Sequence, residues 1–443
     1  MTRWWAERAW LGGERVAERV LIEVDGELLS SVEAGRDAPA GARRLAGLVL
    51  PGLANAHSHA FHRALRGRTH GGRGDFWSWR ERMYQLAARL EPDGCLALAR
   101  AAYAEMALAG ITTVGEFHYL HHPPGGGRYA DPNAFGAALM AAAADAGVRL
   151  TLLDACYLQA DVDGSPLAGP QLRFGDGDAE RWAGRVSALD ATGARVGAAI
   201  HSVRAVPPAA MRLVAAWARE RDAPLHLHLS EQRRENQACL AATGLTPAGL
   251  CAEQGVLGPG TTAVHATHLD DGDVALLGGG RTAVCMCPTT ERDLADGIGP
   301  AGRLAAAGSP LALGSDSHAV VDLFEEARAV ELDERLATER RGNHRPSDLL
   351  AAATEGGARA LGWPGAGAIA PGRLADLVAV RLDTPRLAGA PADDLLAAVV
   401  FAATAADVSD VVVGGRQVVA DGRHLLVGDV AAALDEAIRT VTE

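Results

Sequence analysis

The sequence predicts an α/β fold, a (β/α)8 TIM barrel with a small β-sandwich domain formed by the N- and C-terminal segments. Two observations lead to this prediction. Between about residues 48 and 366, short apolar runs alternate with amphipathic helical stretches, which is the order of elements in a parallel barrel. Outside that range the chain contains short strands broken by Gly and Asp, as in a small antiparallel sheet.

Eight apolar runs of the central region are the candidate barrel strands. They are Leu48–Leu53, Thr112–Phe117, Arg149–Cys156, Val196–His201, Pro224–Leu229, Thr262–Leu269, Thr282–Pro288 and Pro310–Ser315. The stretches between them are rich in Ala and Arg, and Cys95–Ala109 and Ala209–Arg221 have the apolar spacing of helices. Eight strands alternating with helices are what a parallel barrel requires.

The two ends of the chain predict a second, smaller domain. Val20–Glu33 alternates apolar and polar residues around an Asp-Gly turn, which indicates a hairpin. Near the other end the short strands are Gly372–Val380, Val408–Val413 and Arg416–Ala420, followed by a closing helix over Asp429–Glu443 with Asp429 as its N-cap. We expect residues 1–49 and 368–443 to form one composite β-sandwich domain, and residues 50–367 to form the catalytic barrel.

The composition narrows the classes of partner. The chain has 443 residues, 48% hydrophobic and 22% charged, with a formal net charge of −13. This charge argues against a nucleic-acid partner, which calls for a basic face. No stretch has the apolar length of a signal peptide or a membrane span, so we expect a cytoplasmic protein without a membrane partner. The six cysteines have no regular spacing and are expected to be reduced thiols.

The chain contains no lysine, so all 42 basic residues are arginine. A Schiff-base lysine, a phosphate-loop lysine and a carbamylated lysine that bridges two metal ions are therefore excluded.

Residues that suit a metal ion follow several of the predicted barrel strands. In a parallel barrel the active site lies at the carboxyl ends of the strands. His57 and His59 are two residues apart on an extended segment, so both rings face one side. The other candidate ligands after strands are His228 and Asp316. Three imidazoles and one carboxylate suit one zinc ion or a similar divalent cation, with a position left for water.

Two further residues are candidates for proton transfer. Glu231 follows His228 by three residues and can move protons between water and a substrate nitrogen. His265 is the candidate base or electrostatic stabiliser, and Asp316 helps to orient and deprotonate the water. Structural alternatives exist: Glu231 can act as a first-turn helix acid, and Asp316 as a helix N-cap.

Other histidines and cysteines have a simpler interpretation. His226, two residues before His228, is either a ligand-type residue of the same cluster or a satisfied core histidine, and His268 is interpreted as structural. The thiols of Cys285 and Cys287 are explained by a buried seventh strand better than by metal binding.

These motifs resemble those of the amidohydrolase superfamily, which has His-x-His after strand one, His after strands five and six, and Asp after strand eight. Over essentially its whole length the chain is similar to the N-formimino-L-glutamate deiminases of histidine degradation. The matching stretches are Ala56–Arg63, Phe76–Met83, Glu116–His122, His201–Val206, His226–Gln232, Val264–His268, Pro288–Ile298 and Gly314–His318.

The resemblance implies an activity and a set of substrate contacts. It implies metal-dependent hydrolysis of N-formimino-L-glutamate to N-formyl-L-glutamate and ammonia, with one Zn²⁺ per chain, in a homodimer. Arg80, Tyr119, His201 and Arg204 fall on positions that hold the glutamate moiety in that family, and arginine binds carboxylates in bidentate fashion. His62 stands where that family has glutamine, next to the formimino group.

Two rival functions remain open on the sequence. One is another mononuclear deaminase of the same superfamily that acts on a guanine-like or triazine ring. Such a pocket favours aromatic stacking and amide donors, whereas Arg80 and Arg204 favour a dicarboxylate. The other rival is a catalytically silent barrel that serves as a scaffold, which has no need for the full ligand set or for Glu231.

Overall fold

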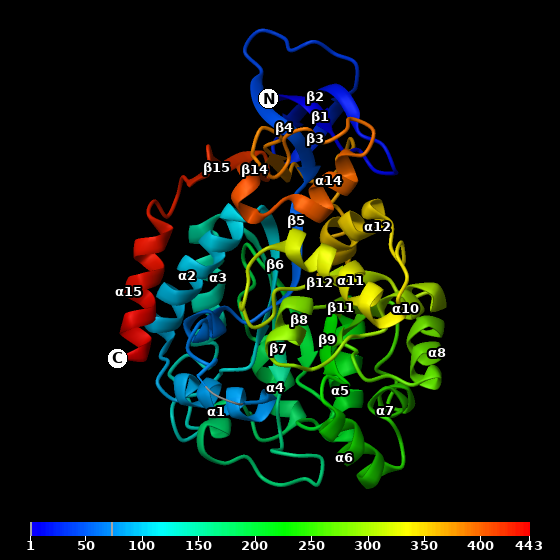
Figure 1. Cartoon of the computed structure of the whole chain (residues 1–443). Coiled ribbons are helices and arrows are strands. Elements are labelled where there is room, and N and C mark those ends of the chain that lie inside the picture. Colours follow the sequence, from blue (N-terminus) through cyan, green and yellow to red (C-terminus); the bar gives the residue numbers. More distant parts are fainter. Residues whose placement is uncertain (1, 72–73) are drawn as a thin grey trace.

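The computed structural model describes residues 2–71 and 74–443. It contains two eight-stranded sheets, of which the central one is a parallel barrel and the other lies at one end of that barrel (Figure 1). Among the described residues, none of the helices combines the length and the apolar character that a bilayer crossing requires.

The barrel strands follow one another around the sheet in chain order. They are β5 (Leu53–Ser58), β6 (Ile111–His118), β7 (Arg149–Cys156), β8 (Arg195–Ile200), β9 (Leu225–Leu229), β10 (Thr261–His265), β11 (Ala283–Met286) and β12 (Leu311–Leu313). Each pairs with the next in parallel, and a parallel bridge between Ser58 and Asp316 joins the last strand region to the first. The (β/α)8 prediction is confirmed.

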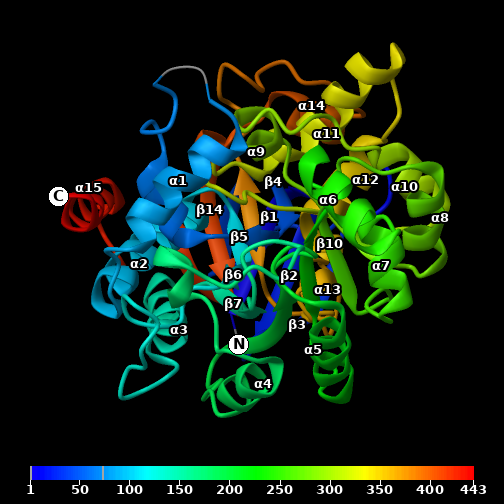
Figure 2. The same cartoon turned by 90° about the horizontal axis from the view of Figure 1, so that it is seen from below.

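Helices surround the barrel, and Figure 2 shows them from the end at which the strands finish. They are α1 (Phe76–Ala87), α2 (Pro92–Leu108), α3 (Ala134–Ala146), α4 (Ala179–Ser187), α5 (Pro208–Glu220), α6 (Arg233–Thr243), α7 (Pro247–Glu253), α8 (Asp271–Gly279), α9 (Pro288–Asp293), α10 (Ala301–Ala307), α11 (Leu323–Thr338), α12 (Pro346–Ala351) and α13 (Gly357–Ala360). Residues such as Phe117, Leu153 and Val214 belong to the large buried core of the barrel and its helices.

The two ends of the chain build the second sheet together. Its order is β16-β15-β14-β13-β4-β1-β2-β3. The strands are β1 (Thr2–Ala9), β2 (Ala17–Asp25), β3 (Leu28–Glu33), β4 (Arg43–Pro51), β13 (Leu377–Val380), β14 (Val408–Val413), β15 (Arg416–Ala420) and β16 (Arg423–His424). The predicted hairpin is present as β2 and β3, which are antiparallel. A separate core that includes Trp4, Ile22 and Leu377 belongs to this sheet.

Two helices complete the C-terminal part of the chain. Helix α14 (Leu395–Ala402) precedes β14, and α15 (Val430–Thr442) ends the chain against α2 (Figure 1). Asp429 caps α15 by accepting a hydrogen bond from the Ala432 N–H, as predicted. The division into residues 1–49 with 368–443 and residues 50–367 stays a prediction.

The first predicted barrel strand is wrong in position. Most of Leu48–Leu53 belongs to β4, whose Leu48–Pro51 pairs with β13 in the second sheet, and the barrel begins at Leu53. Gly52 separates the two strands at a close approach, because a Cβ there would lie 2.2 Å from the Thr112 Oγ1. Leu48–Pro51 and Leu53–Ser58 are buried at every position, so their apolar residues run together without a periodicity that marks the junction. His57 consequently lies inside strand β5 rather than after it.

Candidate active site

The four predicted metal ligands converge at the carboxyl ends of the barrel strands. One ligand atom from each of His57, His59, His228 and Asp316 lies within 4.8 Å of the others, and all four residues are buried. The Nε2 atoms of His57 and His228 are 3.1 Å apart. The Asp316 Oδ1 lies 3.3 Å from the His57 Nε2 and 3.2 Å from the His59 Nε2.

Backbone carbonyls set the orientation of two of these rings. The His59 Nδ1–H donates to the Phe117 carbonyl at 2.9 Å, and the His228 Nδ1–H donates to the His201 carbonyl at 2.8 Å. Their Nε2 lone pairs therefore face the centre of the cluster. Burial also lowers the pKa of His57, to about 3, and that of His228 well below its ordinary value. Neutral rings with facing lone pairs repel one another unless a cation lies between them, so this donor set fits one divalent ion.

Closure of the barrel brings the first and last ligands together. The Asp316 N–H donates to the His57 carbonyl at 3.0 Å, and the His59 N–H donates to the Asp316 carbonyl at 3.1 Å. Asp316 has φ of +41°, a left-handed conformation that is strained for a residue with a Cβ. Gly314 allows the approach, because a Cβ there would lie 2.8 Å from the His57 Cβ. The helix N-cap alternative for Asp316 is not what the structure shows, since its carboxylate faces His57 and His59.

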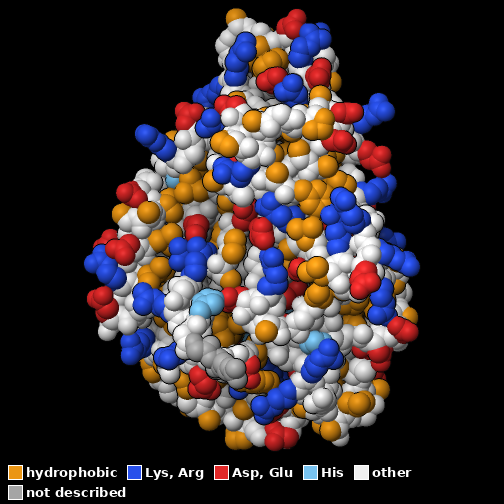
Figure 3. All heavy atoms as spheres, in the orientation of Figure 1, with side chains coloured by type: hydrophobic (Ala, Val, Ile, Leu, Met, Phe, Trp, Pro, Cys, Tyr) orange, Lys and Arg blue, Asp and Glu red, His pale blue; other side chains and the backbone are white. Residues whose placement is uncertain are grey.

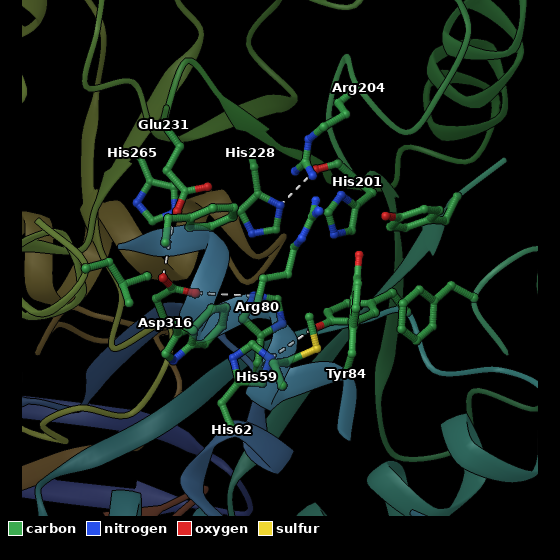
Figure 4. Close-up of a pocket in the computed structure, with 17 residues that line it drawn as sticks. His59, His62, Arg80, Tyr84, His201, Arg204, His228, Glu231, His265 and Asp316 are labelled. Carbon is green, nitrogen blue, oxygen red and sulfur yellow. Dashed lines mark hydrogen bonds and ion pairs between the residues drawn. The ribbon is translucent and has the colours of Figure 1, made fainter. Parts of the chain in front are cut away.

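Glu231 and His265 lie beside Asp316 (Figure 4). The His265 Nε2 is 3.9 Å from the Glu231 Oε1 and 3.7 Å from the Asp316 Oδ2. Burial raises the pKa of Glu231 to about 7, although the neighbouring His265 opposes this shift. For His265, burial lowers the pKa, but the Glu231 carboxylate and other nearby acids outweigh burial and raise it well above its ordinary value. A carboxyl group that titrates near neutral pH can both accept and return a proton.

A pocket opens onto these residues. It contains every predicted site residue except His57, which is fully buried behind it. Figure 4 shows Glu231, His265 and Asp316 on one side of the pocket, and Arg204, His201 and Tyr84 on the other. The lining residues are His59, His62, Phe76, Trp79, Arg80, Met83, Tyr84, Tyr119, Tyr157, Phe174, His201, Arg204, His228, Glu231, His265, Leu294 and Asp316.

The two predicted carboxylate-binding arginines share a tryptophan. The guanidinium carbon of Arg80 lies 4.5 Å from the Trp77 ring centroid, and that of Arg204 lies 5.7 Å from it. The Nε atoms of both arginines are buried and have no hydrogen-bond partner within the described part of the chain. Glu235, which is also buried, approaches Arg204 at 3.9 Å. Helix α1 and the segment that follows β8 thus place two cationic groups where an anion can bind.

His62 and Tyr119 both line the pocket and are in direct contact. The His62 Nε2 is 2.8 Å from the Tyr119 Oη, and the Tyr119 hydroxyl is also 3.4 Å from the Met83 Sδ. Burial lowers the pKa of His62 well below its ordinary value, so the ring is neutral.

A second cluster of metal-type residues lies outside the pocket and has a different explanation. His118, His121 and Asp154 are close enough to share an ion. However, the Arg185 guanidinium binds the Asp154 carboxylate at 2.8 and 2.9 Å, and Asp176 at 2.9 Å. A permanently charged guanidinium therefore already balances these carboxylates, and a metal ion there would meet its repulsion.

The simpler interpretations of the remaining histidine and cysteines are consistent with the structure. The His226 Nε2 lies 2.9 Å from the Ala360 carbonyl, as expected of a satisfied core histidine. Cys285 lies in β11, Cys287 follows that strand, and both are buried free thiols.

Sequence reasoning missed several residues of the site. Tyr84 and Tyr157 line the pocket, and both hydroxyls accept hydrogen bonds from the Gln171 side chain. Tyr84 follows Arg80 by four residues, so helical spacing on α1 was a usable signal. No local pattern marks Tyr157 or Glu235, because their places depend on how separate loops and helices meet.

Comparison with known proteins identifies one matching family, several relatives of similar sequence and solved structures with a similar fold. Residues 48–418 match the pattern of the Amidohydrolase family. The chain is 40% identical to formimidoylglutamate deiminase of Pseudomonas aeruginosa over 438 residues, which covers 96% of both proteins. It is 35% identical to 8-oxoguanine deaminase of the same organism, covering 85% of this chain and 83% of that protein. Among solved structures, an amidohydrolase from Brucella melitensis aligns over the full length of both chains with a TM-score of 0.93 and 34% identity.

Proposed function

This chain belongs to the amidohydrolase family, and on that premise we propose that it hydrolyses N-formimino-L-glutamate to N-formyl-L-glutamate and ammonia. The observation that carries the proposal is the pair of pocket arginines, Arg80 and Arg204, beside a cluster of three histidines and one aspartate. The cluster suits hydrolysis of a C=N bond, and the arginines suit a dicarboxylate. The 40% identical Pseudomonas aeruginosa relative bears the name of this activity.

The pocket orients the substrate between its two sides. The glutamate carboxylates are held by Arg80 and Arg204, with Tyr119 and His201 as neutral partners. The buried Nε atoms of Arg80 and Arg204 have no hydrogen-bond partner within the described residues, so they can donate to an anion. The formimino carbon is thereby directed to the side of the pocket that holds Glu231, His265 and Asp316 (Figure 4). Because the substrate and the proton-transfer residues are already held in the right geometry, less entropy is lost in reaching the transition state of hydrolysis.

The reaction uses three proton-transfer residues, His265 and Asp316 on the water and Glu231 on the substrate nitrogen. His57, His59, His228 and Asp316 would hold the divalent ion, which would supply the Lewis acidity that makes water a nucleophile near neutral pH. His265 and Asp316 orient the attacking water and accept its proton. Glu231 gives its proton to the formimino nitrogen as the water oxygen bonds to the formimino carbon. It then takes the proton of the new hydroxyl group and passes it to the same nitrogen, so that the C–N bond breaks, ammonia leaves and the formyl C=O forms. The proton held by His265 returns to Glu231, whose Oε1 lies 3.9 Å from the His265 Nε2, and restores the starting state.

A direct assay tests the proposed function. Purified protein is supplied with N-formimino-L-glutamate, N-formimino-glycine or guanine, and ammonia release is measured. We expect N-formimino-L-glutamate to be preferred by a large factor in kcat/KM, because only it can engage both arginines. Preference for guanine would replace the proposal with the rival heterocycle deaminase. No ammonia from any substrate of either class, in protein that contains its metal, would favour the silent scaffold.

The proposal also includes the identity of the ion, the cellular context of the enzyme and the class of its substrate. Zinc is proposed as the ion because the site offers three imidazoles and one carboxylate. A cytoplasmic homodimer that acts in histidine degradation is proposed from the resemblance to the deiminases. The interspersed acidic and basic side chains on the face shown in Figure 3 support a small-molecule substrate rather than a nucleic acid. Metal analysis and light scattering test the ion and the subunit number.

A further inference from the structure

We infer that Glu291 is a positioning residue for His265: its carboxylate holds the Nδ1–H of the imidazole, so that the Nε2 faces the reacting atoms. This inference rests on the role proposed above for His265 and deepens it. Glu291 itself does not line the pocket and therefore acts only through the histidine.

The oxygen of Glu291 that contacts His265 is itself held in place by a second hydrogen bond. The Glu291 Oε1 lies 3.3 Å from the His265 Nδ1 and accepts a hydrogen bond from the Cys287 N–H at 2.9 Å. Cys287 immediately precedes α9, the short helix that carries Glu291, so the carboxylate is tied to its own helix start. Glu291 is 3% exposed, and so is shielded from water that would compete for the histidine.

Holding the Nδ1–H decides what the other ring nitrogen can do. With the Nδ1–H held by Glu291, the Nε2 is the ring nitrogen that faces the reacting side, 3.7 Å from Asp316 and 3.9 Å from Glu231. When that nitrogen takes a proton from the attacking water, the ring becomes positively charged. The Glu291 carboxylate stabilises this charge from the opposite side of the ring, as carboxylates do for other catalytic histidines.

The backbone at this position does not orient the ring by itself. His265 has φ of +67° and Ala266 has φ of +50°, so the chain turns sharply at the end of β10. This turn brings the imidazole to the edge of the barrel, where its ring stacks on that of His228 with 5.7 Å between the centroids, but neither contact fixes which ring nitrogen carries the proton. Glu291 supplies this constraint by accepting the Nδ1–H of His265. It does so from α9, the helix that follows strand β11.

Kinetics of the metal-loaded enzyme test the inference. Glu291→Gln is expected to lower kcat about 10- to 100-fold, the range for carboxylates that orient active histidines, with KM and metal content unchanged within about twofold. The matched control is Glu326→Gln. Glu326 is also buried and accepts the Thr289 N–H of α9 at 3.0 Å, but it makes no contact with His265. An equal loss of kcat in Glu326→Gln would show that loosening of α9 is the cause, and would overturn the inference.

A double-mutant cycle isolates the route of action. In a His265→Asn background, which suits the left-handed backbone, Glu291→Gln should cause no further loss of kcat. A loss by the same factor in both backgrounds would show that Glu291 acts independently of the histidine, contrary to the inference.

A spectroscopic measurement does not depend on which substrate the enzyme uses. In protein labelled with ¹⁵N-histidine, the His265 signals are identified by their disappearance in His265→Asn. We expect a proton on Nδ1 in the wild type, whose resonance shifts or vanishes in Glu291→Gln and persists in Glu326→Gln. A proton only on Nε2, or an unchanged resonance in Glu291→Gln, would refute the inference. If the resonances behave as expected but N-formimino-L-glutamate is not hydrolysed, the proposed function alone fails.

Discussion

Replacing Arg204 with methionine removes one of the two cationic groups that we assign to the substrate carboxylates. The Arg204 side chain is 5% exposed, so water cannot replace the lost interaction efficiently. Leaving a buried carboxylate unpaired costs about 2–5 kcal/mol, which corresponds to a loss of about 30-fold to several thousandfold in kcat/KM. We therefore expect a loss of at least about tenfold for Arg204→Met, and a similar loss for Arg80→Met, with the metal retained.

The neighbouring charges require two companion variants. Glu235 lies 3.9 Å from Arg204 and would lose its partner, so Arg204→Met combined with Glu235→Gln separates that effect from the loss of substrate binding. Arg234→Met is the matched control for charge. Arg234 stacks on Trp77 at 4.5 Å, as Arg80 does, but it is exposed and does not line the pocket. We expect Arg234→Met to stay within about twofold of the wild type.

The assay compares each variant on two substrates. N-formimino-L-glutamate and an analogue with one carboxylate replaced by an amide are each followed by ammonia release. The amide should weaken the wild type far more than the variant that lacks the matching arginine, because the two losses are then the same interaction. Normal kcat/KM on the dicarboxylate in both arginine variants would refute the assignment, and so would a loss in Arg234→Met as large as in Arg204→Met.

Three further predictions concern the metal, the proton-transfer group and the fold. Glu231→Gln should keep its metal and lose about a hundredfold or more in kcat; near-normal turnover would reject the proton-transfer role. Metal analysis of chelator-free protein should give one divalent ion per chain, and His228→Ala should lose it; two ions per chain would contradict the site. Asp407, which accepts two hydrogen bonds from Arg386 at 2.8 Å each, has its pKa lowered from 3.8 to about 2, because those and other hydrogen bonds outweigh its burial. The ionised Asp407 carboxylate therefore adds its whole contribution to the free energy of unfolding above about pH 4. This contribution is lost as the pH falls through about 2 and the carboxylate is protonated in the folded protein. Urea unfolding should show Asp407→Asn less stable than wild type at pH 5, with the gap narrowing toward pH 3; a constant gap would argue against this linkage.

Much of the barrel could be predicted because its signals are local. Runs such as Arg149–Cys156 and Pro224–Leu229 are apolar, short and separated by helical spacing, and the structure has β7 and β9 there within a residue. The junction between the two sheets could not be placed, since Leu48–Pro51 and Leu53–Ser58 are both continuously buried. An apolar run does not say which of two sheets it joins, and only the pairing of β4 with β13 decides that.

The chemistry of the site divides in the same way. The sequence by itself predicted the four candidate metal ligands and Glu231, because each is a ligand-type or acidic residue at or near the end of a strand, and parallel strands bring their carboxyl ends to one edge. The tertiary structure decided which groups surround them. Glu291 meets His265 only through the turn into α9, and Arg204 shares Trp77 with Arg80 only because α1 lies over the barrel mouth. Such contacts join elements far apart in the chain, and they depend on how each helix is rotated against the sheet, which local sequence patterns do not encode.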